Sequence, residues 1–118
     1  MVSATVNSWR GLRAAWRMEE AVRQETTLAL LFVPLALPVG VDLTHILLLW
    51  ITCALVILAE LVNTAIETIV DRIGPEHDPL SGLAKDLGSA VVFITLVLFL
   101  LVWIPSLWQY ARGLAAAA

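Results

Sequence analysis

The sequence predicts an all-α membrane protein, with three transmembrane helices and an amino-terminal amphipathic surface helix. Apolar residues make up 60% of the 118 residues, charged residues make up 14%, and the mean hydropathy is +0.89. A water-soluble domain is about half apolar and about a quarter charged, so this chain places most of its aliphatic side chains in lipid. We expect one membrane-embedded domain over residues 1–118.

Three apolar stretches, at residues 26–41, 43–70 and 87–111, are each expected to cross the membrane. At about 1.5 Å per residue the first extends roughly 24 Å, which is short of a hydrocarbon core about 30 Å thick. Pro34 and Pro38 each remove a backbone donor from this span, which is therefore expected to be marginal. Residues 71–86 are expected to form the loop between the second and third spans.

Residues 5–24 are expected to form a helix on the membrane surface. At about 100° per residue, apolar and basic side chains fall into two neighbouring stripes, made of Trp9, Leu12 and Trp16 and of Arg10, Arg13 and Arg17. This pattern is typical of a helix that lies in the headgroup region. Glu19 and Glu20 fall on the apolar side, so we expect at least one of them to have a partner.

The basic residues predict the orientation of the spans. Arg72 and Lys85 lie between the second and third spans, no basic residue lies between the first two, and the first span is preceded by Arg10, Arg13, Arg17 and Arg23. Because cytoplasmic flanks collect Lys and Arg, we place the amino terminus and residues 71–86 in the cytoplasm. Arg112 then lies outside as an exception.

Composition excludes two kinds of site. Seven basic and ten acidic residues give a net charge of -3, which leaves no basic surface to neutralise nucleic-acid phosphates. Cys53 is the single cysteine, so an intrachain disulfide and a Cys-based zinc site are both excluded. Residues 1–25 alternate polar and apolar side chains, so we also expect no cleavable signal peptide.

Polar side chains form a stripe along the second span. Glu60, Asn63, Glu67 and Asp71 fall within an arc of about 80° on one helix face. A charged group inside a span costs roughly 2.5 to 3.5 kcal/mol on insertion scales, so such residues face a bundle interior and mark function. Glu60 lies deeper and suits a proton acceptor, whereas Glu67 lies near the headgroups and suits a metal ligand. The alternative is structural, with interhelical hydrogen bonds made by Asn63 and a glutamate.

The loop between the second and third spans concentrates further polar chemistry. Asp78-Pro79 indicates a turn, after which Pro79 can begin the third helix. Lys85 then emerges at the membrane surface, where its ammonium can meet a phosphate or can simply mark the cytoplasmic side. His77 is more typical of a solvated loop histidine than of a ligand.

Two motifs together resemble the small integral-membrane diacylglycerol kinases of bacteria. The first is E-x-x-N-x-A-I-E-x-x-x-D over residues 60–71, with A-K-D at 84–86, and the second is S-W-R-G-L-R-A-A-W over residues 8–16, with Glu19 and R-Q-E at 23–25. The resemblance extends from about Ser8 to Tyr110. The run Gly-Ser-Ala at 88–90 is more similar to the diacylglycerol branch than to the related undecaprenol kinases.

The resemblance implies a homotrimer in the bacterial inner (cytoplasmic) membrane, with active sites shared between chains on the cytoplasmic side. The implied reaction is ATP-dependent phosphorylation of the free hydroxyl of sn-1,2-diacylglycerol to phosphatidic acid. Transfer of the phosphoryl group would be direct and in line, with a glutamate as general base and Mg²⁺ supplied as MgATP. Membrane lipids and ATP are the expected partners.

The resemblance also implies a role for individual residues. Glu60 would be the general base with Asn63 in support, and Glu19 and Glu67 would be the metal ligands. Contacts to ATP would come from Glu19, Glu67, Asp71, Glu76, His77, Asp78, Lys85 and Asp86. The lipid site would contain Ser8, Arg13, Ala14, Ala15, Trp16, Glu60 and Ser89. Family members often have a substrate-contacting arginine upstream of the first motif, and residues 1–7 contain none, so weaker affinity is expected.

Other functions stay open at the level of the sequence. No P-loop or protein-kinase signature is present, but phosphoryl transfer needs mainly positioning and charge neutralisation, which carboxylates, a metal and a lysine supply. Undecaprenol kinase is the nearest alternative. A small proton-coupled multidrug transporter also uses an intramembrane glutamate, although it does not explain the gathering of carboxylates and Lys85 at one leaflet. A noncatalytic assembly subunit explains the stripe but not the loop.

Overall fold

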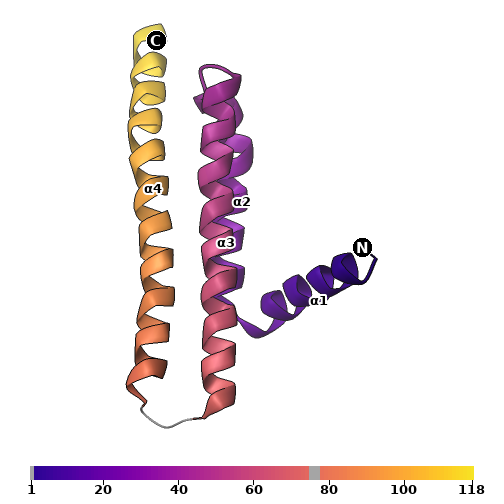
Figure 1. The fold of residues 1–118 in the computed structure, drawn as a ribbon. Coiled ribbons are helices and arrows are strands. Elements are labelled where there is room, and N and C mark those ends of the chain that lie inside the picture. The colour runs from indigo at the N-terminus through magenta and orange to yellow at the C-terminus, as the bar shows by residue number, and fades with distance from the viewer. Residues whose placement is uncertain (1, 75–77) are drawn as a thin grey trace.

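The computed structural model describes residues 2–74 and 78–118, and the described part of the chain consists of four helices. They are α1 (Val2–Met18), α2 (Glu20–Val39), α3 (Leu43–Ile73) and α4 (Pro79–Ala117). In Figure 1, α2, α3 and α4 run alongside one another, and α1 points away from them. Helix α3 is central, since it packs against both α2 and α4.

Helices α2, α3 and α4 are each long and apolar enough to cross a membrane. They contain 20, 31 and 39 residues, or about 30, 46 and 58 Å at 1.5 Å per residue. The first span was predicted to be a marginal segment of 16 residues. In the structure the helix that contains it is longer, because residues 20–25 form the beginning of α2. Helix α2 also continues through Pro34 and Pro38.

The surface helix ends earlier than expected. Helix α1 ends at Met18, so residues 20–24 belong to α2 and not to the predicted helix over 5–24. Glu19 has extended backbone, with φ -115° and ψ 111°. The guanidinium of Arg23 donates from Nη1 to the carbonyl oxygens of Trp16 and Arg17, both at 2.9 Å. The direction of the chain therefore changes at Glu19.

A tight connection joins α2 to α3. Asp42 caps α3, where its side chain accepts a hydrogen bond from the backbone N–H of His45 at 2.8 Å. A Cβ at Gly40 would collide with Ile46 Cγ1, so the short connection needs a residue without a side chain. His45 Nε2 also lies 2.8 Å from Ser106 Oγ, and this hydrogen bond ties α3 to α4 at the same end of the bundle.

The core lies in the half of the bundle that contains this connection. Phe32, Phe99 and Trp103 form an aromatic cluster with centroid separations of 4.9 to 5.6 Å. The indole N–H of Trp103, which is 1% exposed, donates to Thr52 Oγ1 at 3.1 Å. Because a buried indole keeps its hydrogen bond here, the packing satisfies both its apolar ring and its polar atom.

The opposite end of the bundle carries the connection between α3 and α4. Helix α3 continues to Ile73, and α4 begins at Pro79, so the expected loop over 71–86 is largely helical. Asp78 caps α4 by accepting from the backbone N–H of Leu80 at 2.7 Å. The early proline fits this start, because the first turn of a helix does not need its missing N–H.

Candidate functional site

The polar stripe of α3 runs from the bundle interior to solvent. Glu60 is 6% exposed, Asn63 and Glu67 are half-buried, and Asp71 is exposed. From Glu60 to Asp71 the stripe spans roughly 16 Å of helix at 1.5 Å per residue. The α3 helix therefore presents one deeply buried carboxyl group, followed by polar groups that become progressively more accessible.

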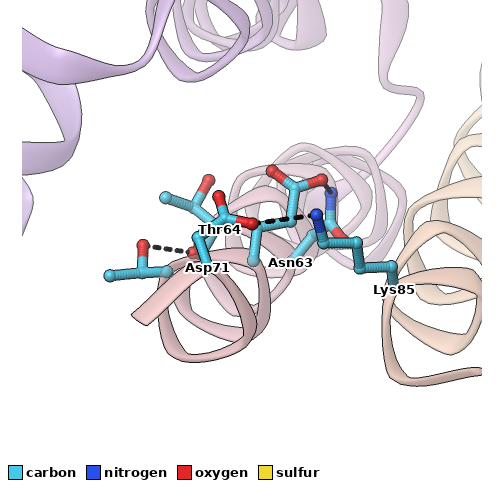
Figure 2. Close-up of polar contacts among 6 residues, drawn as sticks. Asn63, Thr64, Asp71 and Lys85 are labelled. Carbon is cyan, nitrogen blue, oxygen red and sulfur yellow. Dashed lines mark hydrogen bonds and ion pairs between the residues drawn. The ribbon is translucent and has the colours of Figure 1, made fainter. Parts of the chain in front are cut away.

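Asn63 lies where α3 and α4 approach each other closely. Its amide Nδ2 donates to Glu67 Oε1 at 3.4 Å, and Figure 2 draws this contact. A Cβ at Gly88 of α4 would collide with Asn63 Oδ1, so the approach depends on the glycine. Within residues 2–74 and 78–118, Asn63 Oδ1 is buried without a hydrogen-bond partner, so it is an unsatisfied acceptor.

An ion pair joins the exposed end of the stripe to α4. Lys85 Nζ lies 2.9 Å from Asp71 Oδ1, and Figure 2 shows the two side chains meeting between the helices. The side chains are 46% and 68% exposed, so water screens the pair and it contributes little to stability. Its main consequence is to hold the Lys85 ammonium beside the carboxylate stripe, where solvent reaches it.

Sequence reasoning missed one carboxyl group, that of Glu25 in α2. The charge of Glu25 acts on Glu60, and so do the charges of Glu67 and Glu19. Glu25 Oε2 is buried and has no hydrogen-bond partner among the described residues. The available signal was its position, a glutamate one residue before the apolar stretch at 26–41. Packing of α2 on α3 brings it to the base of the stripe.

The predicted metal ligands are Glu19 and Glu67, both half-buried. Among the residues that the structure describes, no group of three or more His, Cys, Asp or Glu side chains could hold a metal ion. This donor set nevertheless fits Mg²⁺, which typically takes one or two carboxylates together with substrate phosphates and water. Both carboxylates lie within electrostatic reach of Glu60.

A cavity of about 540 Å³ lies between α1 and α3. From α1 and the following joint it is lined by Ser8, Gly11, Leu12, Ala14, Ala15, Met18 and Glu19, and from α3 by Leu61, Thr64, Ala65 and Thr68. The structure thus gathers Ser8, Ala14 and Ala15 of the predicted lipid site around one space with Glu19. The other four predicted lipid-site residues do not line it: Arg13, Trp16, Glu60 and Ser89.

The remaining predicted nucleotide contacts lie along the start of α4. Asp78 is exposed and caps the helix, and Asp86 is exposed beside Lys85. Glu76 and His77 lie outside the described residues. Asp71, Lys85 and Asp86 therefore mark the accessible end of the site, and Glu60 marks its buried end.

Comparison with known proteins places this arrangement in a family. The sequence model of the prokaryotic diacylglycerol kinases matches residues 6–107. The chain is 44% identical over 110 residues to the diacylglycerol kinase of Escherichia coli strain K12, covering 93% of this chain and 90% of that protein.

Two further relatives agree. The diacylglycerol kinase of Haemophilus influenzae is 44% identical over 103 residues, which are 87% of each chain. That of Pseudomonas aeruginosa is 39% identical over 103 residues, or 87% of this chain and 84% of the relative. With matches of this length and identity, the chain belongs to the prokaryotic diacylglycerol kinase family and is an enzyme.

Proposed function

We propose that this chain uses MgATP to phosphorylate the free hydroxyl of diacylglycerol, giving phosphatidic acid at the cytoplasmic leaflet of the inner membrane. The relatives that carry the name diacylglycerol kinase support the substrate. The observation that carries the proposal is the buried carboxyl of Glu60, with Glu19, Glu25 and Glu67 within electrostatic reach. Such a cluster suits an alcohol that must lose a proton beside a highly charged nucleotide.

The cavity between α1 and α3 offers a place for the lipid. Its lining is mostly small or apolar, and it borders Glu19 and the residue after Glu60. The hydroxyl of diacylglycerol lies at the headgroup level, so it can enter sideways beneath α1 while its acyl chains stay in the bilayer. Arg13 and Trp16 on α1 would then hold the lipid at the interface.

Glu60 acts as the general base in this proposal. It accepts the hydroxyl proton while the hydroxyl oxygen bonds to the γ-phosphorus and the bond from that phosphorus to the bridging oxygen of ADP breaks. Asn63 supports the reacting groups by positioning Glu67, to which its amide donates a hydrogen bond. The proton later leaves Glu60 for solvent through the accessible end of the stripe.

Charged residues at the accessible end bind the nucleotide. Lys85 exchanges its contact with Asp71 for the phosphates, since an exposed ammonium loses little on leaving a solvated carboxylate. The further ATP contacts in the proposal are Asp71, Glu76, His77, Asp78 and Asp86. Glu19 and Glu67 would hold Mg²⁺, which when bound neutralises negative charge on the phosphates.

The proposal includes a homotrimer with sites shared between copies. Within the described residues, buried oxygen atoms of Glu25 and Asn63 have no partner in one chain. Only 11% of the most apolar part of α4 is buried in the monomer. In lipid, such faces pack against other helices through close contacts and interhelical hydrogen bonds. Cross-linking of the purified protein in nanodiscs tests the number of copies.

The decisive assay gives the purified protein γ-labelled ATP and a panel of lipid alcohols that contains diacylglycerol and undecaprenol. Label in phosphatidic acid supports the proposal. Label in undecaprenyl phosphate alone would overturn the substrate, and no lipid labelling with a correctly assembled protein would overturn the reaction. A reaction without the protein gives the background labelling.

A further inference from the structure

The joint between α1 and α2 is built around Arg23. Its guanidinium donates to the carbonyl oxygens of Trp16 and Arg17, and its backbone N–H donates to Glu19 O at 3.2 Å. On the other side, the backbone N–H of Glu19 donates to Ala15 O at 3.0 Å. The backbone N–H of Glu19 is therefore hydrogen-bonded to α1, and its carbonyl oxygen is hydrogen-bonded to the backbone of Arg23 in α2.

These bonds replace those that an uninterrupted helix would make. The last carbonyl groups of a helix have no intrahelical donor, and in a continuous helix Trp16 O and Arg17 O would accept from the two N–H groups four residues later. In the structure the guanidinium of Arg23 supplies both donors instead. The side chain thus satisfies, in the bent form, the acceptors that would otherwise favour a straight helix.

The local sequence does not itself require a bend. Residues 17–21 read Arg-Met-Glu-Glu-Ala, which contains neither Gly nor Pro and consists of good helix formers. Helical propensity therefore favours continuation through Glu19, as our prediction of a helix over 5–24 assumed. A contact from outside this segment must select the bend, and the hydrogen bonds from Arg23 to Trp16 and Arg17 are such a contact.

The bend decides where Glu19 lies. At the joint its side chain is half-buried, lines the cavity between α1 and α3, and acts electrostatically on Glu60. A straight helix would carry α1 away from α3 and open that cavity. We propose that Arg23 is a positioning residue, whose guanidinium keeps the joint bent and thereby holds Glu19 at the kinase site. The inference rests on the proposed role of Glu19 in binding magnesium.

The joint is tested by a distance that does not depend on activity. Spin labels at Asn7→Cys in α1 and Ile73→Cys in α3, both exposed positions, are introduced with Cys53→Ala and diluted with unlabelled chain in nanodiscs. With Arg23 present we expect one narrow distance distribution. R23M, which keeps an unbranched side chain but removes every side-chain donor, should broaden and shift the distribution, and R23K should restore part of it. R10M, which removes a neighbouring positive charge, should leave it unchanged.

The link to Glu19 is tested by magnesium titration of turnover in the same variants. R23M should raise the Mg²⁺ concentration for half-maximal turnover by about tenfold or more, as expected for losing charge-assisted hydrogen bonds, with R23K intermediate. An unchanged distance distribution in R23M or R23K, whichever assembles, would overturn the inference. The inference would also be overturned if R23M shifts the distance but leaves the magnesium requirement unchanged, while E19Q raises the magnesium requirement. If E19Q leaves the magnesium requirement unchanged, the proposed metal role itself fails, and the link to Arg23 fails with it.

Discussion

Replacing Gly88 by alanine tests how closely α3 and α4 approach at the site. Gly88 is buried, and a Cβ there would collide with Asn63 Oδ1 and lie 3.4 Å from both Asn63 Cγ and Ile66 Cδ1. The amide of Asn63 must turn aside to make room, because it is the end of a short flexible side chain. Turning aside breaks its 3.4 Å hydrogen bond to Glu67.

Two opposing effects set the magnitude for G88A. Alanine in a helix interior gains about 0.5 to 1 kcal/mol over glycine. Overpacking a tight contact costs about 1 to 3 kcal/mol, and the lost hydrogen bond to a charged group adds to that cost. The cost exceeds the gain, so we expect a net loss of roughly 1 to 2 kcal/mol of unfolding free energy. Displacement of Asn63 should also lower turnover about tenfold, which corresponds to about 1.4 kcal/mol in the transition state.

Reversible unfolding by SDS titration and labelled-ATP turnover measure the two effects. Gly113→Ala is the matched control, because it lies on the same helix and a Cβ there meets nothing within 4 Å. It should be as stable as the parent or slightly more so, with unchanged turnover. If G88A behaves like G113A in both measurements, α3 and α4 do not meet as closely as described, and the reasoning about Asn63 is refuted.

Three further substitutions test the proposed chemistry. E60Q should lower turnover by about 10² to 10⁴-fold, as loss of a general base does, while the oligomer survives; size-exclusion chromatography checks assembly, and near-parental turnover would remove Glu60 from the base role. E67Q should raise the magnesium concentration needed for half-maximal turnover, and an unchanged titration would argue against ligation. K85M should raise the KM for ATP by about 10- to 100-fold, as loss of a charge-assisted hydrogen bond predicts, and should leave stability nearly unchanged because its ion pair is exposed. A KM within twofold of the parent would place Lys85 outside the nucleotide site.

Much of the architecture could be predicted from the sequence. The second and third spans, the polar stripe on α3 and the separate amino-terminal helix all follow from hydropathy and a period of 3.6 residues. These signals are local, since each depends on residues a few positions apart along one helix. The length of the first transmembrane helix was underestimated for a related reason. Hydropathy stops at the charged residues 20–25, whereas the backbone hydrogen bonding of α2 continues through them.

The sequence by itself determined that this is a helical membrane enzyme of a known family, with a glutamate and an asparagine facing inward on one helix. Only the tertiary structure decided that the chain bends at Glu19, that Glu25 lies within electrostatic reach of Glu60, and that Gly88 allows α4 to pack closely against Asn63. The reason is physical. Periodicity tells which face of a helix is polar, but the neighbour of that face depends on how separate helices pack, and that packing is a property of the whole chain.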